Sequence, residues 1–291
     1  MALSKLSGDE AGVVFIQLCN VLEPRLAVYL SGASNELWAT TQAMRQQLRA
    51  DHEVAAALCL KMGLRSCKEL REAKQVVWIN RGLSTADMAT LGTLGSVLPA
   101  LLALLIIESS AGAGGPDRVQ RLAEGLGAGA LPAVTFLGFG YMHVGDAGAS
   151  ALAAALGRGA LPRLKSLSLI NTAIGDAGLV ALAPALRRLP ALEKLSLIGS
   201  PFGDEGLATL VAPPPPAGAL SPPTRGMKKL KTLDLSDTEV SDAGCAALVS
   251  ALDSGALPAL ERLKLNHIPA SAAEKEAVQA ALARSRAALP P

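Results

Sequence analysis

The sequence predicts an α/β solenoid, a stack of strand–helix units that follows an all-α region. One observation behind this prediction is an internal repeat of about thirty residues. Another is that each repeat joins an alternating apolar stretch, typical of a strand, to apolar residues at helical spacing. Composition agrees: 50% of the residues are hydrophobic but only 3% are aromatic, so the core must consist of small aliphatic side chains. Such side chains suit many thin, similar layers.

Leu-Pro pairs mark the start of most repeats. The pairs begin at Leu98, Leu131, Leu161, Leu189 and Leu257, and Met227 takes the equivalent place once. Successive starts are 28 to 38 residues apart. A more degenerate unit covers about residues 73–97, with QVVWINRG in the strand position. We therefore predict repeats over 71–291 and a separate helical region over 1–70.

The clearest repeat is LPRLKSLSLINTAIGDAGLVALAPALRR, residues 161–188. In LKSLSL, leucines alternate with polar residues, as expected of a half-buried strand. After a turn, Leu179, Leu182 and Leu186 recur at helical spacing, so one face of a helix should return onto the strand. One unit alone cannot bury both apolar faces, whereas stacked units form a continuous core.

This pattern resembles the leucine-rich repeat of the ribonuclease-inhibitor-like type, LxxLxLxxN followed by a helix, over roughly residues 73–291. The resemblance implies a horseshoe with parallel strands on its concave face and helices on its convex face. We expect a protein-binding module, and no catalysis, because the sequence offers no convergent polar site. Asn171 matches the asparagine of the motif, whereas the other repeats have Glu108, Tyr141, Gly199, Asp237 and His267 there.

Side chains that point outward from the strands differ between early and late repeats. In the late repeats they are polar, for example Lys194, Thr232 and Arg262. In the early repeats they are apolar, and Gly138 and Gly140 should leave room between them. Soluble monomers rarely expose so much contiguous apolar surface. We predict that a protein partner on the concave face contacts Val77, Ile79, Leu105, Ile107, Phe136, Ile170 and Ile198.

These apolar residues also fit three alternatives, which stay open at the level of the sequence. A register shift of one residue would place them in the core, and the N-terminal helices could instead fold over the strands. A structural or assembly subunit, whose apolar concave face is permanently covered inside a larger complex, would carry the same residues.

Four aspartates recur just before the helical part of a repeat: Asp146, Asp176, Asp204 and Asp242. We predict that they are helix N-caps, because a carboxylate there accepts unpaired backbone N–H groups. The alternative is a ladder of carboxylates that holds a hard cation.

One repeat contains the proline-rich stretch VAPPPPAGALSPPTRG, residues 211–226. Because proline cannot continue a helix, we predict that a surface loop replaces part of the helix there. A PxxP ligand for an aromatic groove is the alternative.

The first seventy residues have no Leu-Pro frame. We predict short helices that start near Asp9, after Pro24 (ending near Gly32), at Asn35 (extending to Met44) and over 52–62. The layout is similar to an F-box, through Phe15, Leu18, Leu22, Pro24, Leu26 and Leu30. This resemblance implies docking onto the Skp-type adaptor of a cullin ubiquitin ligase, with the repeats selecting the substrate. The alternative is a helical cap on the open end of the stack.

Several classes of function are disfavoured by composition. With 27 basic and 25 acidic residues and no long run of one sign, no nucleic-acid footprint is expected. Four cysteines without CxxC spacing predict neither a metal site nor disulfides. GLGAGA, residues 125–130, follows a helix instead of opening one, so it predicts a turn and no cofactor.

The remaining features concern membranes and location. The most apolar run, residues 97–107, is too short for a membrane span. The first residues lack an apolar signal core. We therefore expect an intracellular protein, cytoplasmic or nuclear, that is not secreted.

Overall fold

The computed structural model describes residues 13–15, 19–33, 35–108, 117–212 and 227–287. The chain divides into two compact units. The first, here the N-terminal unit, comprises Met1–Ala73 and Val97–Ala100. The second, here the repeat unit, comprises Lys74–Ser96 and Leu101–Pro291.

The N-terminal unit contains the helices α2 (Arg25–Ser31), α3 (Asn35–Thr40), α4 (Gln42–Lys61) and α5 (Cys67–Glu72). Phe15, Ala27 and Leu48 form one cluster of buried apolar residues in this unit. None of the helices that the structure describes is long and apolar enough to cross a membrane.

Sequence reasoning located some of these helices correctly. The helix predicted after Pro24 is α2, and it ends at Ser31 with Gly32 as its C-cap, close to the predicted end near Gly32. The predicted separate helix over 52–62 is wrong, because α4 is continuous for 20 residues. The break falls earlier, at Thr41, whose hydroxyl donates to the Leu37 carbonyl oxygen. The start predicted near Asp9 lies outside the described residues.

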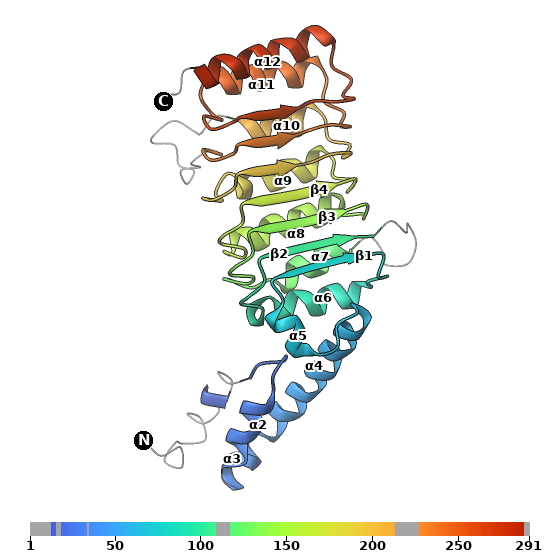
Figure 1. Ribbon diagram of the computed structural model, residues 1–291, viewed down its shortest axis with the longest axis vertical. Coiled ribbons are helices and arrows are strands. Elements are labelled where there is room, and N and C mark those ends of the chain that lie inside the picture. The colour runs from blue at the N-terminus through green and yellow to red at the C-terminus, as the bar shows by residue number, and fades with distance from the viewer. Residues whose placement is uncertain (1–12, 16–18, 34, 109–116, 213–226, 288–291) are drawn as a thin grey trace. The chain divides into compact units, whose positions relative to one another are not determined.

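The described residues of the repeat unit contain one parallel sheet of seven strands in chain order (Figure 1). The strands are β1 (Gln75–Ile79), β2 (Ala103–Ile107), β3 (Phe136–Gly140), β4 (Ser166–Ile170), β5 (Lys194–Ser196), β6 (Thr232–Asp234) and β7 (Arg262–Lys264).

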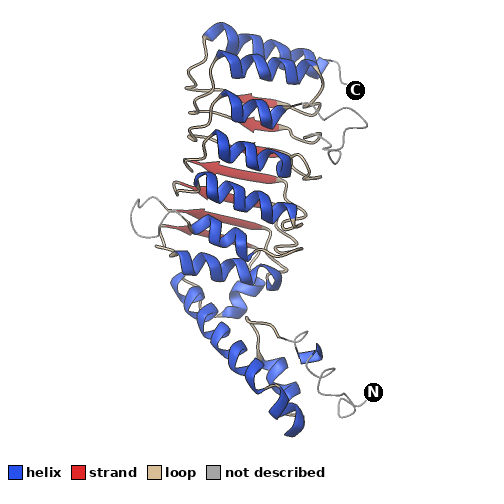
Figure 2. Cartoon of the chain, turned by 180° about the vertical axis from the view of Figure 1, so that it is seen from behind, coloured by secondary structure: helices blue, strands red, loops and turns tan. Residues whose placement is uncertain are grey.

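Helices cover one face of this sheet, as seen from behind in Figure 2. They are α6 (Thr85–Leu94), continued by the 3-10 turn η2 (Gly95–Val97), α7 (Arg118–Gly125), α8 (Gly145–Gly157), α9 (Asp176–Leu186), α10 (Asp204–Val211), α11 (Asp242–Asp253) and α12 (Ala272–Ala287). Strand and helix alternate along the chain, so the predicted α/β solenoid after a helical region is confirmed. We call the uncovered side of the sheet the strand face.

The core lies between the sheet and the helices. In the clearest repeat, Leu167 and Leu169 of β4 and Leu179, Leu182 and Leu186 of α9 are all buried. Each of these leucines belongs to the predicted apolar set. The apolar side of the strand therefore packs against the apolar side of the helix, as the repeat pattern predicts.

The four recurring aspartates do not cap their own helices. Asp176 is the first residue of α9 and the N-cap is Gly175, without a side-chain cap. Its carboxylate instead accepts the N–H groups of Gly203 at 2.9 Å and Gly206 at 2.7 Å, at the start of α10. The carboxylate thus lies one residue too far into the helix to reach its own first N–H groups, and it reaches those of the next repeat.

The other three aspartates behave in the same way. Asp146 accepts from the N–H of Gly175, and Asp242 from the N–H of Ser271. Asp204 accepts the N–H groups of Ser241 and Gly244 and the Ser241 hydroxyl. The prediction of caps within one repeat is thus corrected to a chain of links, each joining one repeat to the next.

The helix that precedes the proline-rich stretch is short. Helix α10 has 8 residues and ends at Val211, whereas α9 has 11 and α11 has 12. Helix α7 is equally short, with 8 residues, so the replacement of part of α10 by a loop stays a prediction. Residues 213–226, most of the predicted loop 211–226, lie outside the described residues.

Candidate functional site

The strand face carries every second side chain of the strands. In β1 the side chains of Val76 and Trp78 are buried against the helices, whereas those of Gln75, Val77 and Ile79 are exposed. Strand β2 has the same alternation. The structure therefore does not have the one-residue shift that would have placed the apolar set in the core.

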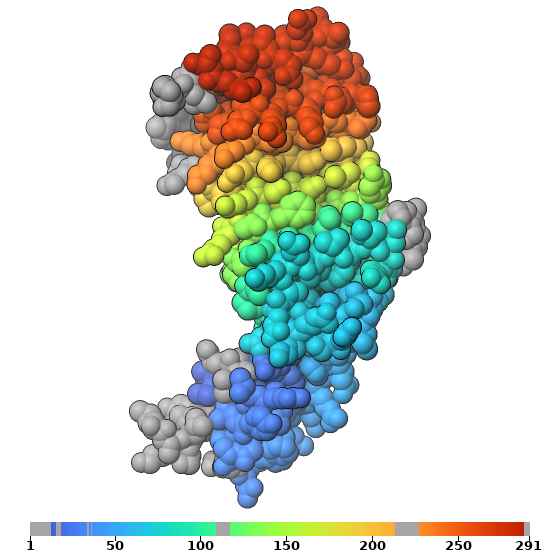
Figure 3. Space-filling view, in the orientation of Figure 1, coloured from blue at the N-terminus to red at the C-terminus, as the bar shows by residue number. Residues whose placement is uncertain are grey.

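Seven outward side chains form what we call the apolar patch: Val77, Ile79, Leu105, Ile107 and Phe136 on β1 to β3, with Ile170 and Ile198 at its edge. Val77 lies beside Leu105, and Ile79 beside Ile107, in the parallel register of β1 and β2. Val77 is 52% exposed and Ile79 54% exposed, and the other five are half-buried. In Figure 3 the repeats follow one another as bands of successive colours.

The two glycines of β3 leave no open hollow. A Cβ atom at Gly138 would lie 2.6 Å from Leu105 Cδ1 and 3.2 Å from the Phe136 ring. At Gly140 it would lie 3.3 Å from Ile107 Cγ1. The room that the sequence suggested is therefore filled by these three side chains, which lie over the glycines and make the patch continuous.

The same rows become polar in later repeats. Leu105 and Gly138 are followed in register by Ser168, Ser196, Asp234 and Lys264. Lys264 Nζ lies 3.1 Å from Asp234 Oδ2, so these two charges form an ion pair across adjacent strands. Arg262 and Lys194 are exposed in the row of Phe136. The strand face thus changes from apolar to polar and basic along the stack.

Two exposed apolar residues at the ends of these strands were not predicted. Leu102, just before β2, is 42% exposed, and Tyr141, just after β3, is 56% exposed. The alternation rule did not select them because they lie outside the three alternating positions of the motif. The sequence could have indicated them, because each directly adjoins a predicted strand that carries residues of the apolar patch.

Most residues at the asparagine position of the motif share one backbone conformation. Tyr141, Asn171, Asp237 and His267 all have left-handed backbones, with φ between 52° and 58°. Glu108 differs: its buried carboxylate accepts the N–H groups of Arg81 and Gly82 in the preceding repeat. A glutamate there satisfies backbone donors that would otherwise be left unpaired.

The residues of the F-box-like pattern lie in different environments. Phe15 and Leu22 are buried in the N-terminal unit, Pro24 and Leu30 are half-buried, and Leu26 is 57% exposed. Leu18 lies outside the described residues. Phe15 and Leu22 therefore belong to the core of the unit, and of the five described residues only Leu26 is freely available to an adaptor.

Further sequence features have structural roles. GLGAGA covers the last residue of α7 and the turn after it, where Gly129 has a φ of 70°. Gly125 lies against α6, since a Cβ atom there would be 2.9 Å from Gly92 Cα. Among the residues that the structure describes, no three His, Cys, Asp or Glu side chains are grouped so as to hold a metal ion.

Comparison with known proteins gives a family for part of the chain. Residues 161–183 and 226–249 match the Leucine Rich repeat family. No curated protein matches the chain.

Similar solved structures are remote in sequence. An internalin from Listeria monocytogenes is 14% identical with a TM-score of 0.33, over 64% of this chain and 48% of that chain. A Bacteroides fragilis protein is 14% identical with a TM-score of 0.45, over 88% and 82%. The C-terminal domain of tropomodulin from Caenorhabditis elegans is 12% identical with a TM-score of 0.37, over 69% and 92%.

This chain thus spans about half of the internalin structure, at 48%.

The two segments that match the Leucine Rich repeat family each include a strand of the sheet, β4 or β6, and the start of the helix that follows it. With the parallel sheet and its layer of helices, they agree with a leucine-rich-repeat solenoid that follows a helical region.

Proposed function

We propose that the chain is a non-catalytic protein-binding module and that the apolar patch receives its partner. The observation that carries this proposal is the continuity of the patch over adjacent strands of the strand face. Leucine-rich-repeat folds typically serve as protein-interaction scaffolds. We assign the repeats to the ribonuclease-inhibitor-like type, because each strand is followed by a helix.

The energetics favour a partner with an apolar segment. Fully burying a Val, Leu, Ile or Phe side chain gains about 1.5–3 kcal/mol. Several residues of the patch still have surface to bury, so together they can supply the apolar centre of an interface. The polar later repeats would then contact a polar part of the same partner, with Lys194 and Arg262 favouring acidic groups.

The test is the double variant Leu105→Asp with Ile107→Asp. We expect capture of the partner from a cell extract to be lost, with nearly unchanged melting, because both side chains face outward. The matched control is Thr232→Asp with Asn266→Asp, which adds the same charge to the polar part of the strand face and should keep capture. Collapse of the fold in the first variant, or intact capture, would contradict the proposal.

We propose further that the N-terminal unit recruits a Skp-type adaptor, which would make the chain the substrate-recognition subunit of a cullin-type ubiquitin ligase. The support is apolar exposure on α2, where Leu26 is 57% and Tyr29 72% exposed. Phe15 and Leu22 would then support this surface from the core instead of touching the adaptor.

The variant Leu26→Asp with Tyr29→Asp tests adaptor recruitment, with Lys68→Asp on α5 as the control. Adaptor and cullin subunits should co-purify with the control and be lost from the double variant, as identified by mass spectrometry. A stable set of partner proteins without ligase subunits would favour the alternative, an assembly subunit whose apolar patch is permanently covered.

We also place the protein inside the cell, in the cytoplasm or nucleus. Its four cysteines are thiols, and Cys59 Sγ lies 3.9 Å from Cys67 Sγ. Burial, with a contribution from Cys67, raises the pKa of Cys59 to about 12, so little of the reactive thiolate exists at neutral pH. Close thiols of this kind persist most readily in a reducing compartment.

A further inference from the structure

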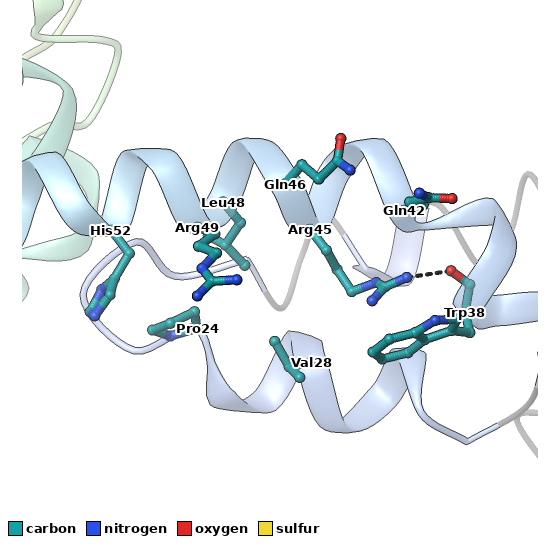
Figure 4. A pocket seen from close by; sticks show the side chains of 9 residues that line it. All are labelled: Pro24, Val28, Trp38, Gln42, Arg45, Gln46, Leu48, Arg49 and His52. Atoms are coloured by element: carbon teal, nitrogen blue, oxygen red, sulfur yellow. Dashed lines mark hydrogen bonds between the residues drawn. The ribbon is translucent and has the colours of Figure 1, made fainter.

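The N-terminal unit contains a groove between α2 and α4, separate from the strand face (Figure 4). Its volume is about 590 Å³, within the range of pockets that hold a ligand. Pro24 and Val28 of the α2 segment form one wall, and Leu48 lies on the α4 side. Trp38 closes one end and His52 the other.

Arg45 holds a fixed positive charge in this groove. Its guanidinium carbon lies 3.4 Å from the centroid of the Trp38 ring, a cation–π contact. The same guanidinium donates to the Trp38 carbonyl oxygen and, at 3.3 Å, to the Thr41 hydroxyl. Because Arg45 is already held in place, little side-chain freedom is lost when it binds an anion.

Arg49 supplies a second charge on the same side. It lies four residues after Arg45 on α4, one turn and about 6 Å further along the helix. Its side chain is 83% exposed and pairs with Glu53 at 3.3 Å, an ion pair that contributes little at such exposure. None of the nine described residues that line the groove is acidic. The groove is therefore electropositive along α4.

Apolar surface is left open beside these charges. Trp38 is 49% exposed and Val28 41% exposed. One wall can therefore receive an apolar side chain while the other receives anions. Lining residues on α4 run from Gln42 to His52, about 15 Å along the helix axis. That length matches four or five residues of an extended peptide at about 3.3 Å each.

We propose that this groove binds an extended acidic peptide segment of a partner protein. An apolar side chain of the peptide enters between Val28 and Trp38, and two carboxylates pair with Arg45 and Arg49. Carboxylates two residues apart in an extended chain are about 6.6 Å apart, close to the axial step of about 6 Å between the two arginines. The chemistry is an acidic–apolar–acidic sequence. This inference does not rest on the proposed role of the apolar patch.

The test is a random peptide library displayed on phage and selected against the full-length chain. The double variant Arg45→Gln with Arg49→Gln serves for counter-selection. Enriched peptides should carry an apolar residue between two Asp or Glu residues. The best of them, synthesised with a fluorophore, should lose about fivefold or more in affinity for the Arg49→Gln chain and weaken further as salt is raised.

Two variants keep this experiment decisive. Arg49→Gln changes a mostly exposed side chain, so a fold defect cannot explain its effect, whereas Arg45→Gln also removes a contact to Trp38. Arg65→Gln, an exposed arginine outside the groove, should bind the peptide as the unmodified chain does. Enriched peptides without acidic residues, no enrichment at all, or equal affinity for the Arg49→Gln chain would overturn the proposal.

Discussion

At the scale of single residues, each recurring aspartate is followed two residues later by a glycine, and the pair connects neighbouring repeats. Asp146, Asp176 and Asp204 each accept backbone N–H groups of the next repeat. The glycine two residues after the next aspartate lets the carboxylate approach, since a Cβ atom at Gly178 would lie 2.5 Å from Asp146 Oδ1. The sequence identifies the acceptor and its place at a helix start. It does not identify the donor, because the spacing within one repeat carries no information about the neighbouring repeat.

Gly178→Ala tests this packing. Helix propensity alone favours alanine by about 1 kcal/mol, but the added methyl group would also lie 3.0 Å from Asp146 Cα. We expect a net destabilisation of about 1–2 kcal/mol, because the backbone of the preceding repeat must shift. The measurement is the free energy of unfolding in urea. Gly157→Ala is the control, since nothing lies within 4 Å of a Cβ atom there, and it should be neutral or stabilising.

An unchanged or raised stability in Gly178→Ala would show that the carboxylate links contribute little to the contact between repeats.

At the scale of elements, alternation within the strands was sufficient to predict which side chains face outward. Val77, Leu105 and Phe136 all lie on the strand face. The sequence could not predict that Leu105 lies over Gly138, because which residues are neighbours across the sheet depends on the register between strands. In the N-terminal unit no repeat supplied a frame. The break at Thr41 was therefore missed, and a break was wrongly placed within α4.

Helix α12 closes the C-terminal end of the stack in the described part of the chain. Val278, Ala281 and Leu282 of α12 are buried. Because a repeat touches mainly its neighbours, the terminal layer must cover the apolar side of the layer below it.

Val278→Asp should destabilise the chain by about 3 kcal/mol or more, because it buries a charge without a partner. Thermal melting followed by circular dichroism measures this change, with Ala280→Asp on the exposed side of the same helix as control. Equal melting temperatures in the two variants would mean that α12 is not required to cover the stack.

At the scale of the whole molecule, the sequence predicted a repeat region and a helical region, and the structure contains both. The repeat period sufficed for the stack because each strand pairs with its neighbours in chain order. The groove of the N-terminal unit was not predictable, since Pro24, Trp38 and Arg45 are brought together from three segments by helix packing. The change from apolar to polar side chains along one face could be predicted from the sequence, whereas the partner could not.

We expect a protein partner to bind the strand face at the apolar patch. The most direct measurement places a photo-crosslinking amino acid at Val77, on the exposed part of the patch, or at Ala154, on the exposed side of α8. Irradiation of the chain in cell extract should give a discrete crosslinked partner from position 77 and none from position 154. Crosslinks from position 154 alone, or the same products from both positions, would contradict the account.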